Sequence, residues 1–251
     1  MMKVSCIVLG NDGLRIARQL KKGLREKLDI CVARQSRGGI KDTVARVFSK
    51  YDGHIFIMAA GIVVRAIKDL AKDKYTDPAV VVVDEGAHYA VSLLSGHEGG
   101  ANNLTGKVAG ILNAEAVITT KSDALKNVVV GIGFRRNEKK ENLKYAIASA
   151  LKKSKLSLNS LRSISTIDIK RSYMPLLDAA AELGVSVKFF EARKLKLLDG
   201  EHKRSQFVES KIGIGGVCEP AVLLSGRNVK LRLPKTIIKG VAVAVGVEAS
   251  S

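Results

Sequence analysis

The residues best suited to chemistry lie in one short loop, residues 95–100, in which glycines flank an imidazole and a carboxylate. His97 and Glu98 are neighbours in this loop, and an imidazole can move protons between water and a substrate at neutral pH. The sequence leaves a plainer alternative open, in which His97 caps a helix or binds a backbone carbonyl. The loop and its neighbour offer further ligand contacts at Ser95, Gly96, Gly99, Gly100 and Asn102.

This loop leads directly into a helical pattern. Apolar side chains recur every three or four residues from Ala101 to Leu112, as they do on the buried face of a helix. The N-terminus of a helix carries unpaired N–H groups and the positive end of the helix dipole, so it favours an anion. We therefore expect the functional site at this loop.

Two further segments place polar side chains beyond predicted strands. Thr119, Thr120 and Asp123 suit hydrogen bonding to polar ligand edges, although the same residue types also close turns and cap helices. Arg65 lies one helical turn after Gly61, and its guanidinium can bind a carboxylate through two parallel hydrogen bonds.

The second half of the chain carries a weaker motif of the same kind. Gly131 and Gly133 begin a sequence like that of a dinucleotide-binding loop, but Arg136 stands where the third glycine belongs. Together with Arg135 this segment is a fair anion site and a poor nucleotide site. The histidines outside the loop have no metal-ligand spacing and no paired cysteines, so we expect no protein metal site.

Strand and helix patterns alternate along the first half, which predicts a largely parallel sheet covered by helices. Ligands bind beyond the carboxyl ends of the strands in such sheets. Gly61, the segment 84–86 and the loop 95–100 each follow a predicted strand. The strands that we expect in this half are residues 3–9, 28–33, 54–58, 79–84, 88–94 and 115–119.

A new strand pattern at residues 128–130 indicates a second domain. It is followed by helix patterns near 138–153, 174–184 and 217–225 and strand patterns near 162–168, 185–190, 229–233 and 238–246. We expect two α/β domains, residues 1–125 and 126–251, each with a mostly parallel or mixed sheet flanked by helices. The polar segment 191–211 is predicted to be a loop.

The composition is that of a globular protein, with 46% apolar and 26% charged residues. A net charge of +18 favours anionic ligands, and the excess of Lys and Arg is larger after Val128 than before it. Aromatic residues are few and Trp is absent, so nucleic acid is a poor candidate. No apolar run reaches the ~20 residues that span a bilayer. We expect a cytoplasmic protein with reduced cysteines, monomeric or homodimeric and not bound to membranes.

Several ordered segments together resemble the cobalt-precorrin-5A hydrolase family of anaerobic cobalamin biosynthesis. The resemblance covers nearly the whole chain. Two departures stand out: the family often carries a variable segment between its halves, which is nearly absent here, and Tyr173 replaces a family glutamate. The matching segments are residues 57–65, 74–86, 93–102, 117–120 with Asp123, 131–136, 167–170 and 216–221.

The resemblance implies an enzyme that opens the δ-lactone of cobalt-precorrin-5A and releases acetaldehyde, giving cobalt-precorrin-5B. It implies a corrinoid substrate with several carboxylates, and other enzymes of the cobalamin pathway as candidate partners. Cobalt would enter inside the substrate, so no cofactor is expected. The alternative is a carrier that binds corrinoid intermediates without catalysis.

On this hypothesis His97, assisted by Glu98, activates water, and the amides of Gly99 and Gly100 receive the developing oxyanion. Asp123 or Glu85 is the candidate base for loss of acetaldehyde. The residues that would hold the substrate's carboxylates are Arg65, Arg135, Arg136 and Lys170, and Asp84 and Glu219 complete the expected binding set.

Overall fold

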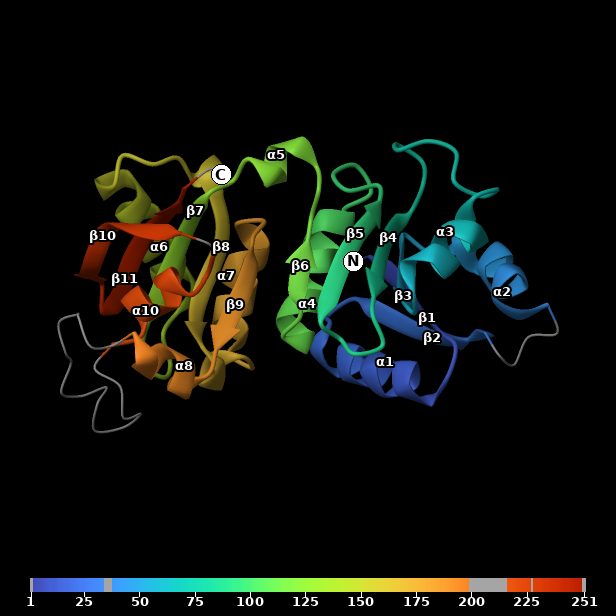
Figure 1. Cartoon of the computed structure of the whole chain (residues 1–251), viewed down its shortest axis with the longest axis horizontal. Coiled ribbons are helices and arrows are strands. Elements are labelled where there is room, and N and C mark those ends of the chain that lie inside the picture. The colour runs from blue at the N-terminus through green and yellow to red at the C-terminus, as the bar shows by residue number, and fades with distance from the viewer. Residues whose placement is uncertain (1, 34–37, 199–215, 227, 250–251) are drawn as a thin grey trace. The chain divides into compact units, whose positions relative to one another are not determined.

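The computed structural model describes residues 2–33, 38–198, 216–226 and 228–249. The chain folds as two compact units, Met1–Thr120 and Lys121–Ser251, and each is described by itself (Figure 1). Each unit is a mixed sheet flanked by helices, which confirms the predicted fold class. In the part of the chain that the structure describes, no helix is long and apolar enough to cross a membrane.

The first unit contains a six-stranded sheet in the order β2-β1-β3-β4-β5-β6. Strands β2, β1, β3 and β4 are parallel, β5 is antiparallel to β4, and β6 is parallel to β5. The bounds are β1 Lys3–Val8, β2 Lys27–Val32, β3 Gly53–Ile57, β4 Ala79–Val83, β5 Tyr89–Leu94 and β6 Glu115–Val117.

Helices cover both faces of this sheet because both faces of its strands are apolar. Along β4, Val81 and Val83 point to one core and Val80 and Val82 to the other. Helices α1 (Asn11–Gly23) and α4 (Ala101–Leu112) pack on the first face; α2 (Gly39–Val47), the short turn η2 (Phe48–Lys50) and α3 (Ala60–Ile67) pack on the second. Burial on both sides is typical of a parallel sheet.

The direction of β5 differs from the simplest expectation of a parallel sheet. Only residues 84–88 connect β4 to β5, and a crossover between parallel strands needs a dozen or more residues. The two strands therefore form a hairpin, and β5 runs back across the sheet. As a consequence, the loop after β5 lies at one end of the strands, and the loops after β3 and β4 lie at the other end. These two ends of the strands are called the two edges of the sheet below.

The second unit contains a five-stranded sheet in the order β10-β11-β7-β8-β9. Strands β7 (Val128–Gly133), β8 (Leu161–Ile167) and β9 (Ser186–Phe190) are parallel, while β10 (Val229–Ile238) and β11 (Val241–Glu248) form an antiparallel extension. Helices α6 (Lys140–Lys153) and α7 (Met174–Glu182) cover one face. Helices α8 (Ala192–Leu197) and α10 (Cys218–Leu223) contribute to two smaller apolar clusters of this unit. The remaining short elements are α5 (Lys121–Ala124), η3 (Leu158–Ser160) and η4 (Asp168–Lys170).

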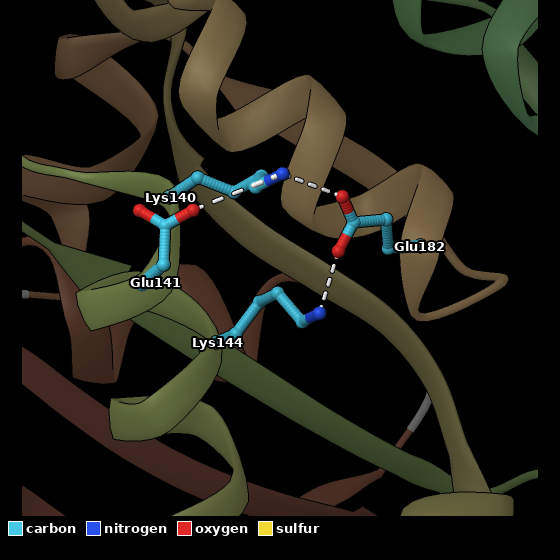
Figure 2. A network of polar contacts seen from close by, with 4 residues as sticks. All are labelled: Lys140, Glu141, Lys144 and Glu182. Atoms are coloured by element: carbon cyan, nitrogen blue, oxygen red, sulfur yellow. Dashed lines mark hydrogen bonds and ion pairs between the residues drawn. The ribbon is translucent and has the colours of Figure 1, made fainter.

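An ion-pair network joins α6 to α7. The carboxylate of Glu182 lies 2.6 Å from the Nζ of Lys140 and 2.5 Å from the Nζ of Lys144 (Figure 2). Lys140 is also 3.8 Å from Glu141. These two lysine pairs hold the pKa of Glu182 down at about 2.

Two predictions for the second unit need correction. The segment 191–211 is not all loop, because Ala192–Leu197 form a helix that Leu195 anchors in a small apolar cluster; most of the rest lies outside the described residues. Strand β10 is also twice as long as the predicted residues 229–233. It passes through Pro234 at register shifts on the sheet edge, where a missing N–H is tolerated.

Candidate active site

The loop 95–100 lies at the edge of the first sheet where β1, β3 and β4 begin, since Leu94 at the end of β5 pairs with Val80 near the start of β4. Strand β6 runs parallel to β5, so Thr119 and Thr120 beyond it belong to this same edge. The prediction that the loop lies with the carboxyl ends of a parallel sheet is wrong for β1, β3 and β4.

Asn102 connects three segments at this edge. Its side-chain oxygen accepts a hydrogen bond from the hydroxyl of Ser92 at 2.7 Å, and its amide nitrogen donates to the hydroxyl of Thr120 at 3.0 Å. Gly96 is packed against the same group, since a Cβ built there would lie 2.9 Å from atoms of Asn102 and Thr120. The structure thus brings three polar side chains, those of Ser92, Asn102 and Thr120, together beside the loop.

Carbonyl groups of the loop already accept hydrogen bonds from several amides at the N-terminus of α4, so fewer of these amides are left for an anion. The amides of Ala101 and Asn102 donate to the carbonyls of Ser95 and Gly96 at 3.1 and 2.9 Å, and the amide of Gly100 donates to the carbonyl of His97 at 3.2 Å. Of the two amides proposed to receive an oxyanion, that of Gly100 already has this partner. The amide of Gly99 donates no hydrogen bond within the described residues.

Ser95 begins the loop in an unusual state. The backbone of Ser95 has a φ of +55°, a conformation that favours glycine, and Ser95 is buried. Its hydroxyl has no hydrogen-bond partner among the described residues. Strain and an unpaired buried hydroxyl in one residue are features that cluster at functional sites.

The imidazole of His97 and the carboxylate of Glu98 sit on the exposed crest of the loop. Hydrogen bonding from its own amide and the nearby ammonium of Lys74 lower the pKa of Glu98 below its usual range. The Lys74 Nζ lies 3.5 Å from a carboxylate oxygen of Glu98. The loop therefore presents an ionised carboxylate beside an imidazole, an arrangement that can bind and activate water.

Lys74 was absent from the predicted site residues. It belongs to the connection between α3 and β4, which runs beside the loop because β4 begins at the same edge. The signal was present in the sequence, since residues 74–86 form one of the segments that resemble the family. Only the hairpin geometry of β4 and β5 brings Lys74 to Glu98.

The opposite edge of the sheet carries Gly61, Arg65, Asp84 and Glu85. The Asp84 carboxylate accepts hydrogen bonds from the Tyr89 amide at 2.7 Å and the Gly86 amide at 3.2 Å, and lies 2.9 Å from the His88 ring. Burial alone would raise the pKa of Asp84, but hydrogen bonds from Tyr89 and His88 outweigh it and lower the pKa.

Glu85 is exposed in the same turn, and Arg65 is exposed on α3, with its guanidinium close to Gly61. The six residues of β5 separate this edge from the loop 95–100 by about 20 Å. The structure therefore does not bring Arg65, Asp84 or Glu85 to His97.

In the second unit, a cationic cluster forms where β7 and β8 end. The Nζ of Lys170 lies 4.4 Å from the ring centre of Phe134 and 5.4 Å from that of Tyr173. Burial and the neighbouring charge of Arg136 lower the pKa of Lys170. Arg135 and Arg136 are exposed beside it. Tyr173 and Phe134 thus present aromatic rings to the ammonium of Lys170.

The remaining predicted residues have structural contacts of their own. A Cβ at Gly131 would lie 1.9 Å from the carbonyl oxygen of Cys218, so this glycine lets α10 cross the strand, whereas Gly133 is less crowded. Glu219 is buried and accepts a hydrogen bond from the amide of Lys235 at 2.8 Å. Asp123 lies in α5 with its carboxylate 2.6 Å from the Nζ of Lys126.

No group of three or more His, Cys, Asp or Glu residues in the described ranges could hold a metal ion. The cysteines Cys6, Cys31 and Cys218 are free, and burial raises the pKa of each thiol. Raised thiol pKa values are those of inert structural cysteines rather than nucleophiles. Within the residues that the structure describes, the loop 95–100 is thus the best-developed candidate for chemistry.

The protein thus consists of two α/β units. The first unit carries the histidine-bearing loop 95–100, and the second carries the cationic cluster around Lys170. Residues 42–123 match the family model described as Cobalamin synthesis G N-terminal, and residues 128–246 match the model described as Cobalamin synthesis G C-terminus. The chain belongs to the cobalamin synthesis G family.

Two curated relatives each match less than half of the chain. The cobalt-precorrin-5A hydrolase of Salmonella typhimurium is 44% identical over 111 residues, 44% of this chain and 32% of that protein. The protein of the same name from Priestia megaterium is 41% identical over 125 residues, 48% and 33% of the two chains. These matches span about a third of the length of either relative.

Among solved structures, a cobalamin biosynthesis protein G homologue from Sulfolobus solfataricus is similar over 98% of this chain and 97% of its own. Its sequence identity is 18% and the TM-score is 0.40.

Proposed function

We propose that this protein is a cobalt-precorrin-5A hydrolase, which opens the δ-lactone of its substrate and releases acetaldehyde by cleaving a carbon–carbon bond. The observation that carries the proposal is the loop 95–100. An exposed imidazole stands there beside an ionised carboxylate, on a backbone that Asn102 ties to Ser92 and Thr120. Membership of the cobalamin synthesis G family and the names of the relatives support the choice of substrate.

The first step is hydrolysis of the lactone. His97 takes a proton from water, the resulting hydroxide adds to the lactone carbonyl, and the carbonyl electron pair moves onto oxygen. We assign the hydrogen bond to this oxyanion to the amide of Gly99, because the amide of Gly100 already donates to the carbonyl of His97. Collapse of the intermediate breaks the C–O bond, and the imidazolium returns its proton to the released hydroxyl group.

The second step releases the two-carbon unit. A base removes the proton of the new hydroxyl group, the C–C bond to the macrocycle breaks, and acetaldehyde leaves. The electron pair of that bond stays on the conjugated ring and is then protonated. Glu85 lies about 20 Å from the loop along β5, so it cannot act on the same atoms as His97. Asp123 is the candidate base that we retain.

Binding of the substrate draws on positive charge. Cobalt-precorrin-5A is a cobalt-containing macrocycle with several carboxylates, and cobalt is part of the substrate in this proposal. Burial of Lys170 and, to a smaller extent, the like charge of Arg136 disfavour its charged form and lower its pKa. Because Arg135 and Arg136 are exposed beside the ammonium of Lys170, and an opposite charge would stabilise all three cations, we propose them as carboxylate-binding residues.

The test is acetaldehyde release from cobalt-precorrin-5A by the intact protein and by His97→Ala. Loss of a general base lowers a rate by about 100-fold or more, and we expect a loss of this size. His88→Ala is the matched control, because His88 is an exposed histidine of the same unit at the other edge of the sheet. Undiminished release by His97→Ala would refute the role of His97.

A loss confined to His88→Ala would move the chemistry to the other edge. Binding with a changed visible spectrum but no acetaldehyde from the wild-type protein would identify a carrier of corrinoid intermediates instead of an enzyme.

A further inference from the structure

The connection before β4 forms a rigid turn beside the loop 95–100. The buried carboxylate of Asp77 accepts hydrogen bonds from the amide of Lys72 at 2.9 and 3.0 Å and from that of Asp73 at 3.0 Å. The amide of Asp77 also donates to the carbonyl of Asp73 at 2.8 Å. A buried carboxylate that accepts hydrogen bonds from two backbone amides holds the chain between those amides and the acid in one conformation, here residues 72–77.

This turn lies directly against the loop. A Cβ built on Gly99 would be 3.1 Å from the carbonyl oxygen of Asp77, so the two backbones are in close approach. At the crest of the turn, the Nζ of Lys74 is 3.5 Å from Glu98 and 4.7 Å from the ring centre of Tyr75. Lys74 therefore joins an aromatic ring to the imidazole–carboxylate pair.

Tyr75, the aromatic residue next to Lys74, is unusually exposed for a large side chain. The relative exposure of Tyr75 is 70%, so most of its surface faces solvent, and the Lys74 ammonium lies over its ring. An exposed ring beside a polar site offers a flat apolar surface to a flat ligand.

We propose that Lys74 and Tyr75 are substrate-binding residues, in which the Tyr75 ring stacks on the conjugated face of the macrocycle and the Lys74 ammonium binds one of its carboxylates. The identity of the ligand rests on the proposed function, whereas the pairing of a ring with an ammonium beside Glu98 is observed in the structure.

The contact between Lys74 and Glu98 suits an exchange of partners. The side chain of Lys74 is 60% exposed, and at 3.5 Å the pair is longer than a charge-assisted hydrogen bond of about 2.8 Å. Exposed pairs of this kind contribute little stability, so transfer of Lys74 to a substrate carboxylate costs little. The transfer would leave Glu98 without its cation and so free it to interact with His97 or water.

The test is a visible-absorbance titration of the intact protein with cobalt-precorrin-5A. We expect Tyr75→Ala to raise the Kd about tenfold and Tyr75→Phe, which keeps the ring, to change it less than twofold. Lys74→Met should raise the Kd and reduce its dependence on salt. Both positions, Lys74 and Tyr75, are exposed, and circular dichroism checks that each variant is folded.

Tyr145→Ala is the matched control. Tyr145 is a half-exposed tyrosine of the second unit with the Nζ of Lys239 4.2 Å from its ring centre, so it repeats the ring–ammonium pair in the other unit. We expect its Kd to equal that of the wild type. Equal Kd values for Tyr75→Ala and the wild type would overturn the inference, and so would an equal loss in Tyr145→Ala.

Acetaldehyde measured in the same samples separates this inference from the proposed function. If the wild-type protein binds the corrinoid without releasing acetaldehyde, the hydrolase proposal fails, and the Tyr75 comparison still decides the binding role. If the wild-type protein does not bind the corrinoid, both proposals are overturned.

Discussion

Replacement of Gly131 by alanine tests how tightly α10 crosses strand β7. The new Cβ would lie 1.9 Å from the carbonyl oxygen of Cys218 and 2.8 Å from a methyl group of Val222. A carbon–oxygen contact needs more than 3 Å, so the backbone of α10 must move by more than 1 Å. Overpacking a core costs 1–3 kcal/mol, and a backbone obstacle belongs at the upper end, at about 3 kcal/mol.

Gly133→Ala provides the control on the same strand. A Cβ at Gly133 would meet only carbon atoms of Val217 and Ala242 at 3.6 and 3.7 Å, which are ordinary contacts. We expect this variant to stay within about 1 kcal/mol of the wild type, with a small gain because alanine restricts the unfolded chain.

Urea unfolding followed by far-ultraviolet circular dichroism measures both variants. The expected result is a lower midpoint for the transition of the second unit in Gly131→Ala, and little change in Gly133→Ala. Equal midpoints for the two variants would refute the close approach of α10 to β7. Gly131 would then have no packing role, and its predicted place in the anion site of the second unit would be its only proposed role.

Two further predictions concern titratable groups. His54 is buried, its Nδ1 lies 2.7 Å from the Ser5 hydroxyl and its Nε2 3.0 Å from the carbonyl of Phe48, and burial lowers its pKa. The unfolded chain therefore binds a proton more readily, so the free energy of unfolding of the first unit should fall as the pH drops below 6.5 and through the lowered pKa. Urea unfolding at pH 7.5 and 5.5 measures this fall, and an equal fall in His54→Gln would contradict the assignment. For the network in Figure 2, carbon-detected NMR should show Glu182 titrating at about 2, with a higher pKa in Lys140→Met, and a wild-type value near 4.5 would disprove the ion pairs.

Most of the fold could be predicted because it depends on local patterns. Continuous runs of β-branched residues such as residues 79–83 and 128–130 mark strands that are buried on both faces, and the structure places strands there. The long helix α6 was predicted from the spacing of Leu143, Ile147 and Ala150, all of which are buried. The short helix α8 was missed because Leu195 is its one buried residue, with Ala192 half-buried beside the same cluster, and so it has no apolar periodicity to detect.

The arrangement of the site was harder to predict because it depends on strand direction. Loop 95–100, Asn102 and Thr120 meet as a set because β5 and β6 are parallel neighbours. The separation of Glu85 from His97 follows from the five-residue connection between β4 and β5, and its length was visible in the sequence. Lys74 could not be placed beside Glu98 by any local pattern, since 24 positions and a strand pair separate them.

The hydrogen bond between Asn102 and Thr120 has a mechanical consequence. Thr120 is the last residue of the first unit, and the chain enters the second unit at Lys121. The hydrogen bond therefore fastens the segment that follows β6 to the first turn of α4, the helix that begins directly after the turn that bears His97. Loss of the Thr120 hydroxyl would release that segment and leave the Asn102 amide with one hydrogen-bonding group fewer to orient it.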